Sequence, residues 1–120
     1  MCMDKINKIV GLLLMSRTMS HKAHLKTGSY AKHMALNSYY DTIVDLTDSL
    51  AEAAQGKYGL MTVPVVEEKG DIDDPINMLE LHLNMFNALS KSIDDRYLQN
   101  IVDEIVALFY STLYKLRYLD

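Results

Sequence analysis

The sequence contains 120 residues, of which 49% are hydrophobic and 23% charged, and its formal net charge is −4 at pH 7. A chain of this size is expected to form one domain with its own core, and the scattered lysines and arginines argue against a nucleic-acid partner. The single cysteine, Cys2, excludes an intrachain disulfide and fits a reducing compartment, so we expect a cytoplasmic protein. No apolar run reaches the length of a membrane span, so no membrane partner is expected.

The first helix is predicted over residues 4–26, because apolar side chains recur there at the spacing of one helical face. This face is made by Ile6, Ile9, Val10, Leu13 and Leu14. The apolar run at residues 9–15 superficially resembles a signal peptide, but it is short and no small-residue cleavage site follows it, which favours the helix. Gly28 is expected to end this helix and Ser29 to cap the next one, so the chain should turn back here.

The second helix is predicted from about Ser29 to Gln55, with Gly56 as its C-terminal signal. At about 100° per residue its apolar side chains share one side. These are Ala35, Leu36, Tyr39, Ile43, Leu46, Leu50, Ala53 and Ala54. The other side carries His33, Asn37, Asp41, Asp45, Asp48 and Glu52. The carboxylates are therefore expected to face away from the core of their own chain.

The second half of the sequence predicts two more helices after a long connection. Residues 57–74 are too many for a simple link between helices, where about 2–8 residues are usual, and their extended sequence is expected to run across the bundle. The third helix is predicted to begin at Asp74-Pro75, and the fourth to span residues 92–119 after a capping-box-like start. The whole chain, residues 1–120, is thus predicted to be a single all-α domain, a four-helix bundle with a long crossover between its second and third helices.

Four side chains that can bind metals stand at suggestive intervals: His21, His33, Asp48 and Glu52. His33 and Asp48 are 15 residues apart on one helix, which is roughly 22 Å, whereas ligands of one ion lie within about 2.0–2.6 Å of it. One copy of the helix cannot bring both to the same ion. A second copy running antiparallel across a two-fold axis would place its Asp48 and Glu52 beside His33. We therefore expect a homo-oligomer with this contact of the second helix, and an ion such as iron, manganese or zinc.

His21 belongs to the first helix and is expected to fold back close to His33. His24 lies one turn nearer to the break at Gly28 and could replace or assist His21 as a ligand. In the alternative interpretation, His24 packs on the core and bonds to a backbone carbonyl. The two-fold axis of the dimer is expected to pass near residues 41–42.

The spacing His21-x11-His33-x14-Asp48-x3-Glu52 resembles the ferroxidase pattern of the Dps family, the ferritin-like proteins of starved bacteria. The match covers the first two predicted helices. The resemblance implies a ferritin-like bundle with an iron site between subunits, where Fe(II) is oxidised by peroxide or dioxygen. It also implies that two histidines of one subunit meet the Asp and Glu of its two-fold mate. The chain also looks like short ferritin-like proteins encoded by large bacteriophages.

A second hypothesis is a non-enzymatic helical dimer or oligomer module that has the ferritin-like fold without metal chemistry. It is favoured by the short chain and by Asn37, which replaces an acid of the Dps pattern and is a weaker candidate ligand. On the fourth helix, Tyr110, Tyr114 and Tyr118 form a stripe that suits an interface or a core better than a redox role. The sequence shows no phosphate-cradling loop and no convincing Ser/His/Asp or Cys/His arrangement, and the one enzymatic activity we expect is the ferroxidase activity that the resemblance implies.

Overall fold

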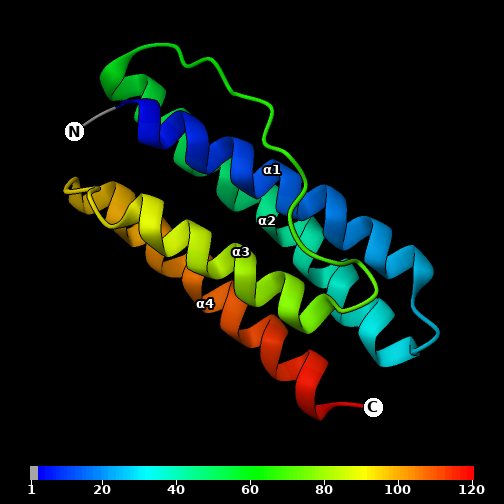
Figure 1. Cartoon of the computed structure of the whole chain (residues 1–120). Helices are drawn as coiled ribbons and strands as arrows, with labels where there is room; N and C mark the ends of the chain where they lie inside the picture. Colours follow the sequence, from blue (N-terminus) through cyan, green and yellow to red (C-terminus); the bar gives the residue numbers. More distant parts are fainter. Residues whose placement is uncertain (1–2) are drawn as a thin grey trace.

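The computed structural model describes residues 3–120 and contains four α-helices (Figure 1). They are α1 (Met3–Lys26), α2 (Tyr30–Tyr58), α3 (Pro75–Ser90) and α4 (Arg96–Tyr118). No strand occurs in this part of the chain. The prediction of an all-α fold with four helices is confirmed, while Cys2 lies outside the described residues.

The helices pack as a bundle in which each helix has two neighbours. Both α1 and α4 pack against α2 and α3, so α1 and α4 lie diagonally opposite each other. Figure 1 shows that neighbouring helices run in opposite directions. The long connection, residues 59–74, returns along the outside of α1 from the end of α2 to the start of α3.

Two predicted helix boundaries are wrong. α2 does not end at Gly56 but continues to Tyr58, because Gly56 keeps a helical conformation and the positive φ, 100°, falls at Gly59. α4 begins at Arg96, a few residues after the predicted start, because the buried Ile93 holds the preceding segment in a turn. The Ile93 amide donates to the carbonyl of Ser90 across this turn, at 3.0 Å.

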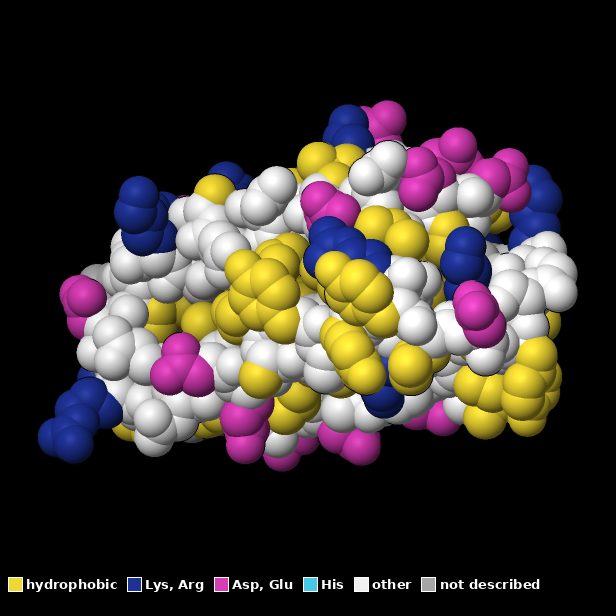
Figure 2. All heavy atoms as spheres, turned by 90° about the horizontal axis from the view of Figure 1, so that it is seen from below, with side chains coloured by type: hydrophobic (Ala, Val, Ile, Leu, Met, Phe, Trp, Pro, Cys, Tyr) yellow, Lys and Arg dark blue, Asp and Glu magenta, His cyan; other side chains and the backbone are white. Residues whose placement is uncertain are grey.

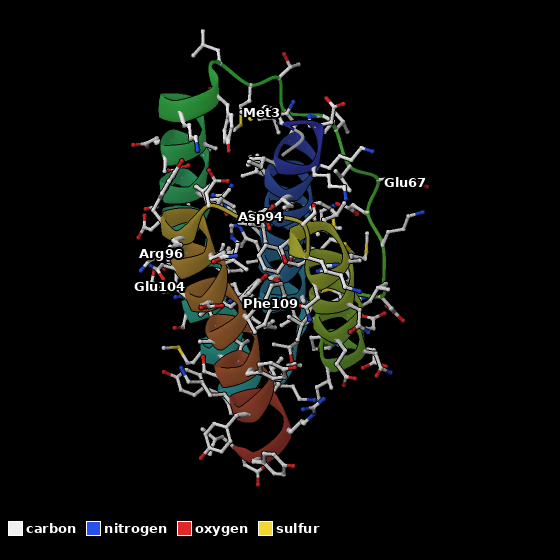
Figure 3. All side chains as sticks on the ribbon, turned by 90° about the vertical axis from the view of Figure 1, so that its left-hand side faces the viewer. Met3, Glu67, Asp94, Arg96, Glu104 and Phe109 are labelled. Carbon is white, nitrogen blue, oxygen red and sulfur yellow. The ribbon has the colours of Figure 1, made fainter. Side chains whose placement is uncertain are left out.

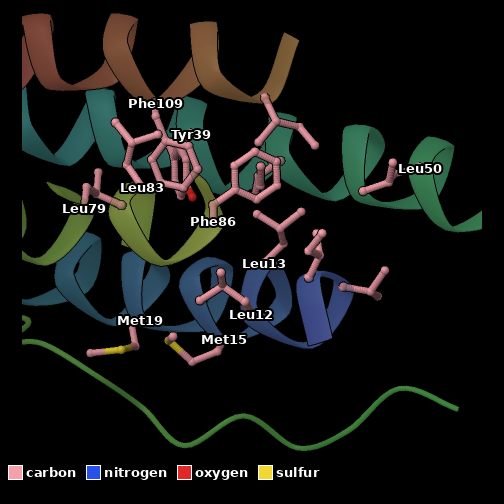
Figure 4. Close-up of a cluster of buried hydrophobic side chains, with 14 of the residues drawn as sticks. Leu12, Leu13, Met15, Met19, Tyr39, Leu50, Leu79, Leu83, Phe86 and Phe109 are labelled. Atoms are coloured by element: carbon pink, nitrogen blue, oxygen red, sulfur yellow. The ribbon is translucent and has the colours of Figure 1, made fainter. Parts of the chain in front are cut away.

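The core lies between the four helices and is centred on three aromatic rings. Tyr39 of α2, Phe86 of α3 and Phe109 of α4 are fully buried. The ring of Phe109 lies 5.4 Å from Tyr39 and 6.2 Å from Phe86, measured between centroids (Figure 4). Leu12 and Leu13 of α1 are also completely buried in this cluster. Removing these apolar surfaces from water, at about 25 cal/mol per Å², is what holds the amphipathic helices together.

The connection at residues 59–74 lies close to α1 because Gly11 has no side chain. A Cβ atom at Gly11 would lie 2.7 Å from the carbonyl oxygen of Pro64 and 2.9 Å from Cγ2 of Val66. Two ion pairs also join the connection to α1: Lys22–Glu68 and Lys26–Asp73. Exposed ion pairs contribute little to stability. The packing of the connection on α1 therefore depends mainly on the close backbone approach at Gly11.

Asp95 fastens the end of α2 to the start of α4. Its carboxylate accepts hydrogen bonds from Lys57 Nζ at 2.8 Å, Tyr58 Oη at 2.7 Å and Tyr97 Oη at 3.1 Å. These hydrogen bonds hold the pKa of Asp95 well below its usual value, and the bond from Lys57 has the largest effect. The same contact raises the pKa of Lys57, so the pair stays ionised over the physiological range.

Candidate functional site

Three histidines and a tyrosine gather where the end of α1 meets the start of α2, and we call His21, His24, His33 and Tyr40 the histidine cluster. The rings of His24 and His33 stack with centroids 3.7 Å apart and planes 22° apart. His21 stacks on Tyr40 at 4.4 Å, and its ring lies 5.9 Å from that of His24. The turn between the two helices therefore brings together the three histidines that the sequence singled out.

Local sequence explains this turn. Gly28 lies between the helices, Ser29 caps α2 by accepting a hydrogen bond from the Lys32 amide at 3.2 Å, and the Ser29 amide donates to Thr27 Oγ1. The cap fixes the first turn of α2. His33 follows one turn later and faces the last turn of α1.

Two reciprocal hydrogen bonds hold the rings of His24 and His33. Nδ1 of His24 donates to the carbonyl of His33 at 2.8 Å, and Nδ1 of His33 donates to the carbonyl of His24 at 2.9 Å. Because a carbonyl oxygen only accepts, each Nδ1 carries the proton, and in a neutral ring Nε2 keeps its lone pair. Metal-binding histidines are commonly fixed by such a carbonyl bond.

The predicted pair His21 and His33 is not in direct contact. Among the described residues, ring contacts link His24 to each of them but do not link them to each other. His24 is 7% exposed and bonds to a backbone carbonyl, as the alternative interpretation of this residue expected. His21 is exposed and His33 is half-buried. His24 therefore lies between the two predicted ligands.

The polar surface continues from the cluster along α2. Tyr40 Oη donates to Asn37 Oδ1 at 2.7 Å, and Asn37 Nδ2 donates to Asp41 Oδ2 at 3.4 Å. Asp48 and Glu52 are exposed further along the same helix, toward its other end. Across residues 3–120, no three His, Cys, Asp or Glu side chains are grouped so that they could hold a metal ion. A single copy thus brings the histidines together but does not add the carboxylates.

A second polar cluster, which we call the His82 chain, is buried inside the bundle. His82 of α3 is completely buried, and its Nε2 donates to the carbonyl of Lys69 at 2.7 Å. Its Nδ1 lies 2.7 Å from Ser16 Oγ, which lies 2.8 Å from Tyr39 Oη. Since the carbonyl cannot donate, the directions follow: Ser16 donates to Nδ1, and Tyr39 donates to Ser16. These bonds satisfy the ring of His82 and join α1, α2, α3 and the long connection.

Ser16 and His82 have the spacing of a nucleophile and its base, but Ser16 is completely buried, so no substrate can reach it. The hydrogen bond between Ser16 and His82 therefore serves the packing of the helices. Burial lowers the pKa of His82, and the hydrogen bond to Lys69 opposes this shift only in part. Burial also raises the pKa of Tyr39, so both groups stay neutral near pH 7.

We expect acidification to destabilise the protein through His82. Its folded-state pKa is lowered, so the neutral ring contributes stability that is fully present above pH 6.5, the ordinary value, and is lost as the pH falls below it. Urea unfolding at about pH 7.5 and about pH 5.5 measures the loss. In His82→Gln, which keeps a donor for Lys69 but does not titrate, the loss should be smaller. An equal loss in both proteins would rule out His82 as the cause.

Sequence reasoning missed the His82 chain. His82 stands two residues from Glu80, so the two side chains point in opposite directions, and Glu80 pairs instead with Arg117 at 2.6 Å. The sequence did contain a sign that His82 is buried: it lies one helical turn before Phe86, on the apolar face of α3. Ser16 likewise interrupts the apolar face of α1. A polar residue on a buried stripe indicates a partner inside the core.

In the part of the chain that the structure describes, no helix is long and apolar enough to span a membrane.

A family model with the description "Family of unknown function (DUF5856)" matches residues 24–116. The match includes His24, His33, Asp48 and Glu52, whereas His21 precedes it.

The chain is also similar to a protein of Enterobacteria phage T4 described as "Uncharacterized 14.6 kDa protein in mobD-ri intergenic region". The two are 29% identical over 114 residues, which cover 94% of this chain and 88% of that protein. No solved structure matches the chain. The identification as a member of the Dps or ferritin-like family is wrong, because the family that matches is a different one. The expected likeness to a bacteriophage protein is supported by the phage T4 relative.

Proposed function

The chain belongs to the family of unknown function DUF5856, and for this member we propose that the histidine cluster binds a transition-metal ion between two copies of the chain. The observation that supports this most directly is the pair of carbonyl bonds at Nδ1 of His24 and His33. They leave the Nε2 atoms as the free ligand positions of both rings. His33 is the central ligand of the proposal, with His21 or His24 as the second.

Carboxylates from a second copy would complete the coordination. Asp48 and Glu52 are exposed on the outer side of α2, roughly 22 Å and roughly 28 Å from His33 along the helix axis. An antiparallel contact of α2 with its copy, about an axis near residues 41–42, brings them over the histidine cluster of the other chain. Each dimer would then hold one ion at each end of the contact, in a mixed nitrogen and oxygen site that suits iron, manganese or zinc.

The fold assignment within this proposal is a ferritin-like bundle, since such bundles have four helices with one long crossover. Iron bound at the dimer contact would supply a centre for oxidation of Fe(II) by dioxygen or peroxide. The histidines would bind as neutral imidazoles, and the carboxylates would favour the ferric product by their negative charge.

Substituting His33 by asparagine is expected to weaken metal binding at least about ten-fold without unfolding the protein. The amide nitrogen of asparagine stands where Nδ1 stood, so the hydrogen bond to the His24 carbonyl is kept while the Nε2 ligand is removed. Anaerobic titration of Fe(II) into the metal-free chain, followed by calorimetry, gives the dissociation constant. Lys32→Asn, on the same turn, is the matched control and should bind as the wild type does.

Two results of this titration count against the proposal. One is that Fe(II) does not bind the wild-type chain at all. The other is that His33→Asn binds it unchanged. If binding occurs, sedimentation should show that metal increases the association of the chain and that Asp48→Asn abolishes this increase, and admission of dioxygen then tests the oxidation of Fe(II).

The second candidate is a helical dimer or oligomer module without metal chemistry. It is favoured by the stacking and the reciprocal bonds of His24 and His33, which by themselves fasten α1 to α2. In that case Asp48→Asn relieves repulsion along the acidic side of α2 and raises stability by a few tenths of a kcal/mol, with or without metal. If metal raises the melting temperature of the wild type but not of Asp48→Asn, this candidate fails.

A further inference from the structure

The outer side of α4 carries a row of exposed tyrosines that the metal proposal does not use. Tyr110, Tyr114 and Tyr118 are 57%, 54% and 73% exposed. Together with the exposed residues Ala107 and Ser111 they form what we call the tyrosine face. Figure 2, which views the molecule from below, shows hydrophobic side chains gathered in clusters between charged ones. Tyrosine has an apolar ring and a polar tip, and it is enriched at protein interfaces.

The tyrosine face lies on the side of α4 that is turned away from the core of its own bundle. The buried side of α4 carries Leu98, Ile105, Phe109, Leu113 and Leu116. At about 100° per residue, the tyrosine face is centred on the opposite side of the helix. Figure 3 shows Arg96 and Glu104 on the outside of α4, while Phe109 points into the bundle.

Charges are distributed unequally along this side of α4. Exposed acids, Asp103 and Glu104, precede the tyrosine face, and the basic residues Lys115 and Arg117 lie at its far end. The helix dipole accounts for bases in the last turn, but not for acids two turns after the start. Glu104 and Lys115 lie within about 20° of each other around the helix axis, so they share one flank. In two antiparallel helices related by a two-fold axis, like flanks meet, and acid then faces base at both ends.

Side-chain sizes agree with the same arrangement. Ala107 and Tyr114 are two helical turns apart, and Tyr110 and Ser111 lie midway between them. In an antiparallel pair centred on residues 110–111, the small Ala107 lies opposite Tyr114 of the other copy. Tyr110 likewise lies opposite Ser111. Each large ring therefore meets a small side chain, as close packing of two helices requires.

We propose that the tyrosine face is a docking surface for a second copy of this chain, whose α4 packs antiparallel to it about a two-fold axis near Tyr110. This contact is distinct from the one proposed for α2, because it uses another helix and no metal. A chain with both contacts has two different two-fold interfaces. They build a closed assembly if the axes intersect at a suitable angle, a tetramer when that angle is a right angle, and an open filament if the symmetry does not close.

The small size of the contact limits its strength. α4 has 23 residues, so its outer side is about 34 Å long and about 10 Å wide, roughly 350 Å² per copy. A stable interface buries about 800 Å² per partner. The association is therefore expected to be weak and reversible.

Charge reversal tests this contact in the full-length chain. Sedimentation equilibrium in the presence of a chelator should show the wild type dimerising with concentration. Glu104→Lys alone and Lys115→Glu alone should each weaken dimerisation about ten-fold, because two pairs of like charges then face each other. The double variant Glu104→Lys with Lys115→Glu should restore it. Lys8→Glu on α1, diagonally opposite α4, is the matched control and should leave dimerisation unchanged.

A second variant tests the rings themselves. Tyr114→Lys should abolish dimerisation, and its melting temperature should match that of the wild type because the residue is exposed. The proposal is overturned if the wild type is monomeric up to about 1 mM, a concentration at which even a weak specific contact is populated. It is equally overturned if dimerisation survives Tyr114→Lys, or if the double charge reversal fails to restore what the single ones remove.

Discussion

Replacing His82 by alanine is expected to lower the free energy of unfolding by about 3 kcal/mol. The substitution breaks the hydrogen bonds to the Lys69 carbonyl and to Ser16 Oγ, both made by a completely buried ring. Each buried polar atom left without a partner costs about 1–3 kcal/mol, and the vacated volume adds a cavity term. Equilibrium unfolding in urea near pH 7.5 measures the difference, provided that the slope with denaturant is unchanged.

Two further variants make this result specific. His21→Ala removes an exposed imidazole, and its effect should stay within about 0.5 kcal/mol. His82→Gln should recover part of the loss, because its amide reaches toward Lys69 as Nε2 does. A loss below about 1 kcal/mol for His82→Ala would mean that water replaces the ring without cost, and the His82 chain would not be a structural element.

Gly11→Val should destabilise the protein by about 2 kcal/mol and loosen the long connection. The new Cβ would lie 2.7 Å from a backbone oxygen of Pro64, and that atom can move only with the connection itself. Val66 stands 2.9 Å from the same point and is displaced as well. Besides urea unfolding, limited tryptic cleavage at Lys69 reports the release of the segment, and it should be faster in the variant than in the wild type.

The matched control is Gly56→Ala. Gly56 is also inside a helix, but a Cβ there meets no atom within 4 Å. Alanine should therefore stabilise α2 by about 0.5–1 kcal/mol, the usual gain in helix propensity. If Gly11→Ala behaved like Gly56→Ala, the connection would not depend on the missing side chain at Gly11.

The helices were predictable because their apolar side chains recur at helical spacing, and the side of the helix that carries them is the side that packs into the core. Most buried positions of α2, among them Tyr39, Ile43 and Leu50, belong to the predicted stripe, and Thr47 is buried beside them without having been predicted. The ends of the helices were less predictable. A glycine such as Gly56 can lie inside a helix or just after its end, and the residues that follow it determine which of the two occurs. The start of α4 depends on Ile93 reaching the core, which is a contact between distant parts of the chain.

Of the candidate site, the gathering of the histidines was predictable and their pairing was not. A break at Gly28 implies that the two helices fold back on each other, and this brings their adjoining turns together. Which ring meets His33 depends on the rotation of α1 about its axis, and packing sets this rotation so that His24 takes the place expected for His21. The His82 chain joins residues 66 positions apart, Ser16 and His82, and no local pattern encodes such a contact.

The route of residues 59–74 along α1 has a consequence for the order of folding. The turn after Lys26 joins α1 to α2, and the turn after Ser90 joins α3 to α4, so each pair can form a hairpin from nearby residues. The two hairpins then have to dock while the connecting segment closes over α1. His82 finds Ser16 and Lys69 only when both events are complete, so this buried ring is expected to form its native bonds after the folding transition state, with a low φ-value.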